Sequence, residues 1–191
     1  MARKILIMLF AIGLLSLVSG MAGSAIFTDA ASVDSNTFTT GSVTISTSPT
    51  TALVTFSNMA PGDSVQPSAG IVVSNDGTLA LRYAVTSTTT EDVLAAVLDL
   101  TIREIDVSAS PPCDDFDGAV IYATADLGST GGIDVIGNPL QGNQGTDRTL
   151  AASATETLCF RVELPLTATG PEGVTTTATF AFQAEQTKNN P

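Results

Sequence analysis

The chain has no histidine and no tryptophan among its 191 residues, and it has only two tyrosines, Tyr83 and Tyr122. Zinc proteases bind their metal through histidine, typically in a His-Glu-x-x-His motif. A serine nucleophile needs a neighbouring base, and Lys188 is the only lysine after Lys4. We therefore expect no enzymatic activity and no catalytic residues. The scarcity of aromatic side chains also argues against a sugar-binding surface.

Positive charge is scarce as well. The chain carries 7 basic and 19 acidic residues, which gives a formal net charge of −12. Nucleic-acid binding depends on lysine and arginine side chains that displace counterions from phosphates. This composition excludes nucleic acid as a partner, and no motif in the sequence predicts a cofactor.

The longest apolar run is too short to span a bilayer. It covers Ile5–Val18, follows Arg3 and Lys4, and precedes the small residues of Ser19–Ala25. A transmembrane helix needs roughly 20 apolar residues. This order of basic, apolar and small segments predicts a signal peptide over residues 1–25, removed by signal peptidase. We expect an extracellular location and no stable membrane span in the mature chain.

Only two cysteines are present, Cys113 and Cys159. In an exported chain the simplest expectation is that they form one disulfide, because thiols outside the cytosol meet oxidising conditions. Two free thiols are the alternative. Two cysteines without histidine do not supply the four ligands of a structural zinc site, so we expect no metal there.

Apolar residues recur at every second position from Phe38 onward, and Gly, Pro and Asn-Asp turns separate these runs. This pattern predicts an all-β domain. Asn75-Asp76-Gly77 is in addition a strong signal for a hairpin turn. The expected strands of the first half contain Val43 and Ile45, then Ala52, Val54 and Phe56, then Ile71 and Val73, then Leu79, Leu81, Tyr83 and Val85.

Two segments depart from this strand pattern. Glu91 and Asp92 precede the apolar run Val93–Leu98, which predicts one short helix. Residues 108–149 are rich in Gly, Asp, Pro and Asn, which predicts a long surface insertion.

The insertion contains three aspartates, Asp114, Asp115 and Asp117, which are either a weak calcium site or a solvated acidic loop. The full spacing of a calcium loop and its terminal Glu are missing. We favour the solvated loop.

The strict alternation returns near the C-terminus. Side chains on a strand point alternately to its two faces, so Phe180 and Phe182 share one face and are expected in the core. By the same argument Cys159 points away from the core, because it lies between Leu158 and Phe160. A bond to Cys113 would fasten the insertion to the outside of the sheet, closing about 45 residues for ~4 kcal/mol.

An ordered series of short motifs resembles the TasA and camelysin family, secreted fibre subunits of biofilm matrices that include archaeal bundling pili. The resemblance covers both ends and the first half of the chain, and nothing aligns with residues 108–149. Its motifs are Gly23–Asp29, Asn36–Ile45, Asn58–Ser64, Val72–Tyr83, Glu91–Leu94 before Leu100–Ile102, and Phe180–Gln186.

The resemblance implies a jelly-roll β-sandwich, here over residues 41–191. It also implies a head-to-tail homopolymer in which an N-terminal arm, residues 26–40, completes a sheet of the next subunit. The apolar side chains of this arm are Ile26, Phe27, Val33 and Phe38.

Three alternatives remain open. In the first, Ile26 and Phe27 belong to a terminus that packs on its own domain or frays. In the second, the protein is a monomeric, adhesin-like surface module. Camelysin relatives have also been classed as metalloendopeptidases, a function for which this chain lacks histidine ligands.

Overall fold

The computed structural model describes residues 37–51, 58–105, 110–169 and 172–190. This part of the chain forms ten strands and no helix, in agreement with the all-β prediction. The strands are β1 (Ile45–Ser48), β2 (Ser64–Val65), β3 (Ile71–Asn75), β4 (Leu81–Thr89), β5 (Asp99–Glu104), β6 (Val120–Asp126), β7 (Ile133–Ile136), β8 (Arg148–Leu150), β9 (Thr155–Glu163) and β10 (Ala178–Gln186).

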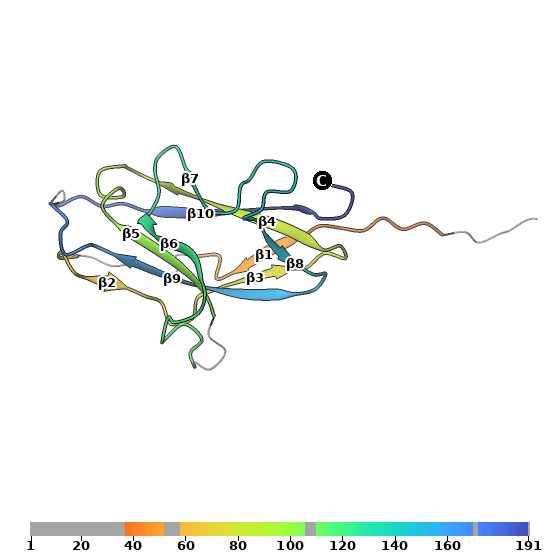
Figure 1. The fold of residues 1–191 in the computed structure, drawn as a ribbon, viewed down its shortest axis with the longest axis horizontal. Coiled ribbons are helices and arrows are strands. Elements are labelled where there is room, and N and C mark those ends of the chain that lie inside the picture. Colours follow the sequence, from red (N-terminus) through yellow and green to blue (C-terminus); the bar gives the residue numbers. More distant parts are fainter. Residues whose placement is uncertain (1–36, 52–57, 106–109, 170–171, 191) are drawn as a thin grey trace, which may run out of the picture. The chain divides into compact units, whose positions relative to one another are not determined.

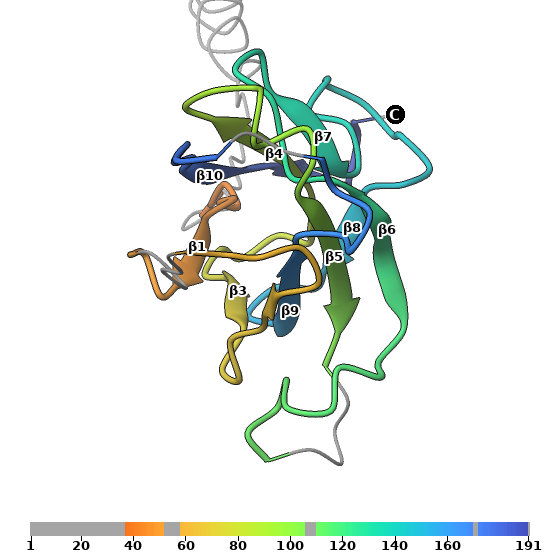
Figure 2. The ribbon, with the colours of Figure 1, turned by 90° about the vertical axis from the view of Figure 1, so that its left-hand side faces the viewer.

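The strands form two antiparallel sheets packed as a β-sandwich (Figures 1 and 2). In the large sheet the order is β1-β3-β9-β5-β6, and β2 pairs with the far end of β9. The small sheet has the order β10-β4-β7, with β8 also on β4. Figure 2 shows the small sheet above the large one, with β10 and β1 on the same side of the sandwich.

The core lies between the sheets and follows the predicted parity. Leu81, Tyr83 and Val85 of β4 face Leu158 and Phe160 of β9, and all five side chains are buried. Burying side chains of this size contributes about 1.5–3 kcal/mol each. The alternating apolar residues of the sequence therefore predicted the core face of these strands correctly.

The predicted helix at 93–98 is wrong, because the structure has a hydrogen-bonded turn there. Its bonds include Ala96 N to Asp92 O at 3.1 Å and Leu98 N to Leu94 O at 3.1 Å. The carboxylate of Glu91 caps this turn, accepting hydrogen bonds from the next free backbone N–H groups. So short a run does not offset the cost of helix nucleation, and β5 begins at the next residue.

The interpretation of residues 108–149 as a surface insertion is also wrong. The segment contains β6 and β7 and leads into β8, so it supplies strands to both sheets. Leu127, Val135 and Ile136 from this segment are buried in the main core. Register shifts interrupt the pairing of β6 and of β7 with their neighbours, and such bulges break the period-two pattern that strand prediction uses.

The turn signal at Asn75-Asp76-Gly77 does not make a hairpin, because β3 and β4 belong to different sheets. The side chain of Asn75 is buried at this crossing. Its Nδ2 donates to the carbonyl oxygens of Leu79 and Ala151, both at 2.9 Å, and its Oδ1 accepts the N–H of Gly77. The Asn thus fixes the passage of the chain from one sheet to the other.

Residues Thr40–Pro191 form one compact unit. The expected strand around Val54 lies outside the described residues. Within the part that is described, no helix is long and apolar enough to cross a membrane.

Candidate functional site

The edge of the small sheet is the first unusual feature. β10 pairs with β4 over nine consecutive residues, from Ala178 opposite Thr89 to Gln186 opposite Leu81, without a shift in register. Among the described residues β10 has no partner strand on its other side. A regular unpaired edge presents a row of free backbone N–H and C=O groups, which is a template for another strand.

A groove of about 620 Å³ runs beside this edge, between the two sheets, and we call it the β10 groove. Its floor is apolar and its rim is rich in threonine, including Thr175 and Thr177 just before β10. None of the described residues that line it is charged, although the chain has 19 acidic residues. The floor contains Leu98, Leu127, Phe160, Phe180 and Phe182.

Phe180 and Phe182 have the inward orientation that the sequence predicted, but both are only partly buried. The ring of Phe180 lies 5.0 Å from that of Phe160, and the ring of Phe182 lies 6.1 Å from that of Tyr83. The face of each ring that does not meet the core is therefore exposed to the groove. Val174, for which the same parity was predicted, is 37% exposed and lies outside any strand.

The opposite end of the sandwich is closed by polar contacts. The hydroxyl of Tyr83 donates to Glu156 at 2.6 Å, and Arg148 binds Glu156 and Glu104. Burial raises the pKa of Tyr83 far above its ordinary value, and the hydrogen bond to Glu156 acts in the same direction. These contacts connect strands of both sheets.

The N-terminal arm enters the domain at this closed end. The carbonyl oxygen of Ser42 accepts hydrogen bonds from the N–H groups of Thr78 and Leu79, at 3.0 and 3.1 Å. Leu81 lies next to them and pairs with the last residue of β10, whereas the groove begins beyond the first one. Because β4 spans ~27 Å, Ser42 and Thr177 lie near opposite ends of the small sheet, although the groove also reaches Thr47, five residues after Ser42.

The predicted disulfide is present. Cys113 and Cys159 are bonded, with 5.5 Å between their Cα atoms, and both are buried. They form a small cluster with Phe116 that is separate from the main core. The bond therefore lies on the outer face of the large sheet, as the parity of Cys159 predicted. We call residues 110–118 the disulfide loop.

Phe116 is a residue that the sequence pattern did not single out. It is buried beside the disulfide, and the guanidinium groups of Arg161 and Arg103 lie 4.3 and 5.4 Å from its ring centre. Such contacts contribute about 0.5–1 kcal/mol at exposed sites. An aromatic residue inside an Asp-rich stretch was the only signal available, and it was not enough to predict this packing.

The structure does not bring the remaining candidate residues together. Ile26, Phe27 and Val33 lie outside the described residues, and Phe38 is 94% exposed. Asp114, Asp115 and Asp117 are exposed in the disulfide loop. In the described part of the chain, no group of three or more His, Cys, Asp or Glu residues is arranged to hold a metal ion.

With the fold in place, a comparison with protein families is informative. The model of the camelysin metallo-endopeptidase family matches residues 3–108, more than half of the chain. The chain belongs to the camelysin family. A search of curated proteins gave no match.

The name of the camelysin family implies a catalytic metal, and the residues of this chain do not fit one. There is no histidine in the sequence, and both cysteines are used in the disulfide. The partly buried carboxylate of Glu156 already binds an arginine and a tyrosine. We therefore derive no metal-dependent step for this family member.

Proposed function

We propose that this protein is a secreted fibre subunit that polymerises when the N-terminal arm of one copy enters the β10 groove of the next. The observation that supports this most directly is the groove beside β10, whose described lining is uncharged and whose regular edge has no partner strand in the described part of the chain. An added strand would pair with that edge and cover the exposed faces of Phe180 and Phe182.

The arm has the composition that such a groove requires. Phe27, Ala31 and Val33 share one face of an extended chain, which also carries Asp29, whereas Asp34 lies on the other face. Residues 26–39 of the arm reach at most ~50 Å when extended, which exceeds the length of β10. The arm therefore spans the groove and leaves residues to bridge two subunits.

The positions of arm and groove favour a head-to-tail chain. The arm joins the domain at the Ser42 contact, near the C-terminal end of β10, and the groove follows the N-terminal half of β10 from Ala178 to Phe182. Donor and acceptor at opposite ends produce an open series of identical contacts rather than a closed pair. Secretion with the signal attached would keep the arm blocked until cleavage.

The test is electron microscopy of the purified mature protein with and without residues 26–37. The full arm should give filaments, and the truncated chain should remain a folded monomer. A matched pair keeps the arm length constant: Phe27→Ser with Val33→Ser should abolish filaments, whereas Thr28→Ala with Thr37→Ala should not. The serine pair removes the apolar side chains that we expect to anchor the donor strand.

Two results would overturn the proposal. Filaments of unchanged form from the truncated chain would show that the arm is not the donor. An intact protein that stays monomeric at every concentration would show that the arm packs on its own domain, in which case the surface-module alternative stands.

A further inference from the structure

One side of the β10 groove is formed by the segment Val65–Ile71, which runs from β2 into β3 and which we call the groove wall. Val65, Pro67 and Ile71 of this segment line the groove. The residues between them have contacts on the opposite side. The groove wall is thus one layer thick, and whatever lies behind it decides its position.

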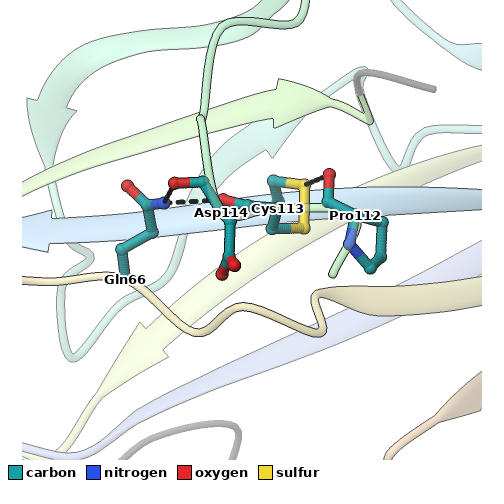
Figure 3. Close-up of a disulfide and its surroundings, with 5 residues drawn as sticks. Gln66, Pro112, Cys113 and Asp114 are labelled. Atoms are coloured by element: carbon teal, nitrogen blue, oxygen red, sulfur yellow. Dashed lines mark hydrogen bonds between the residues drawn. A yellow bond between two sulfur atoms is a disulfide. The ribbon is translucent and has the colours of Figure 1, made fainter. Parts of the chain in front are cut away.

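The disulfide loop lies behind the groove wall (Figure 3). The Nε2 of Gln66 donates to the carbonyl oxygens of Cys113 at 2.6 Å and Asp114 at 3.2 Å. The N–H of Cys113 donates to the carbonyl oxygen of Ser68 at 3.0 Å. A Cβ atom on Gly70 would lie only 2.7 Å from Sγ of Cys113, so the wall and the disulfide are in direct contact.

The other half of the disulfide belongs to the strand that carries the groove floor. Cys159 lies in β9 and points outward, while its neighbour Phe160 points inward to the floor. The single covalent bond therefore connects the floor strand, through the disulfide loop, to the back of the wall. The cluster is separate from the main core, so the two sheets do not depend on it for their packing.

We propose that the Cys113–Cys159 disulfide, acting through Gln66, positions the groove wall so that the β10 groove accepts a strand. This inference rests on the proposed function, because it assigns a role in strand acceptance. A chain without the disulfide keeps its sandwich and its arm. It donates a strand normally and accepts one poorly.

The experiment measures acceptance apart from donation. The starting protein is the full mature chain with Phe27→Asp and Val33→Asp, which disables its own arm and leaves the acceptor intact. A labelled synthetic peptide of residues 26–39 is titrated onto it, and fluorescence anisotropy gives the dissociation constant. Cys113→Ser with Cys159→Ser should then weaken peptide binding at least about tenfold, equivalent to ~1.4 kcal/mol.

A matched control separates positioning from general destabilisation. Leu150→Ala removes a buried side chain of the main core on β8, which does not line the groove. It lowers the melting temperature and should leave the peptide affinity within about twofold, a change of ~0.4 kcal/mol. If the serine pair and Leu150→Ala weaken binding equally at matched stability, the disulfide has only a structural role and the proposal is wrong.

A second variant covers the case in which the serine pair does not fold. Gln66→Met keeps the disulfide and the length of the side chain but removes both donated hydrogen bonds. It should weaken peptide binding about threefold or more, which corresponds to ~0.65 kcal/mol. An unchanged peptide affinity in this variant would refute the proposal even if the serine pair is insoluble.

The outcomes also separate this proposal from the function on which it rests. If the unmodified acceptor does not bind the peptide, strand acceptance itself is refuted. If that acceptor binds but every wall variant binds equally well, the fibre function stands and only the positioning role is lost. In mixtures with intact subunits, disulfide-free chains with a normal arm should cap filaments at the end that presents a groove.

Discussion

Two strands, β10 and β6, end their sheets with a long edge, and these edges differ. β10 pairs with β4 in an unbroken register over its whole length. β6 pairs with β5 through two register shifts, and its last residue, Asp126, lies opposite Asp99. Among the described residues each of the two strands has one partner.

This difference separates a protected edge from an open one. Proteins protect exposed edges with bulges and charged side chains, which prevent a further strand from pairing. β6 has both features. β10 has neither over its first half, and its only charged residue, Glu185, binds Arg82 at the end where the arm enters. The edge without protection is the one beside the groove, which supports the proposal that β10 is the edge for recognition.

The largest expected effect comes from cross-linking the arm to each edge. A cysteine at Val33→Cys in the arm should form intermolecular disulfides with Thr177→Cys at the groove. Thr124→Cys on β6 is the matched control, because it is also an exposed threonine. Non-reducing gel electrophoresis should show a ladder of covalent multimers for the first pair and monomers for the second.

A ladder of equal intensity from Thr124→Cys would remove the distinction between the two edges. A ladder from neither pair, in a protein that still forms filaments, would place the donor strand elsewhere on the surface.

The sequence predicted one of these edges much better than the other. In β10 the partly buried residues alternate with the more exposed ones Thr179, Ala181 and Gln183, and the two faces follow directly from a period of two; the partly buried set is Ala178, Phe180, Phe182 and Ala184. In β6 the bulges shift the side chains between faces, so Tyr122 and Ala125 do not follow one alternating pattern. The Gly and Asp residues around these strands are typical of a loop, which explains why residues 108–149 were wrongly predicted to be a surface insertion.

No local sequence pattern could predict the β10 groove. Its lining joins Phe160 of β9, Phe180 of β10 and Leu98 of the capped turn, which come together only through the pairing of distant strands. The sequence identified Phe180 and Phe182 as inward-facing, and it could not show that both rings are only partly buried and line a groove. The disulfide, by contrast, followed from two cysteines and one strand parity.

An intermediate effect is expected from truncating the aromatic residues of β10. For a fully buried ring, Phe→Ala lowers the free energy of unfolding by about 3–5 kcal/mol. Because Phe180 and Phe182 are only partly buried, we now expect Phe180→Ala or Phe182→Ala to lower the free energy of unfolding by about 2 kcal/mol. Urea denaturation of the arm-disabled monomer measures this value.

The controls for this series point to the opposite face of the same strand. The side chains of Thr179 and Gln183 are exposed. Thr179→Ala and Gln183→Ala should therefore each leave the free energy of unfolding within about 0.5 kcal/mol of the parent value. If Phe182→Ala is neutral while Thr179→Ala unfolds the domain, the inward and outward faces of β10 are reversed.

The smallest expected effect concerns the acidic row at the protected edge. Asp99 lies between Glu163 on β9 and Asp126 on β6, in directly opposed positions. Burial raises the pKa of Asp99, and the charges of Glu163 and Asp126 raise it further. A raised carboxyl pKa means that this site contributes nothing at low pH, where it is protonated in both states, and lowers stability as the pH rises from the unfolded pKa through the folded pKa.

Asp99→Asn should therefore stabilise the domain at neutral pH by a few tenths of a kcal/mol, up to about 1 kcal/mol, because like charges on opposed strand positions repel. The gain should shrink as the pH falls and vanish about one unit below the unfolded Asp pKa of about 3.9, where the carboxyl is protonated in both folded and unfolded chains. Urea denaturation of parent and variant at several pH values measures it. In a Glu163→Gln background the gain should shrink, because the nearest opposed charge is gone. A gain that is independent of pH would show that charge is not its cause, and β6 would then owe its protection to its bulges alone.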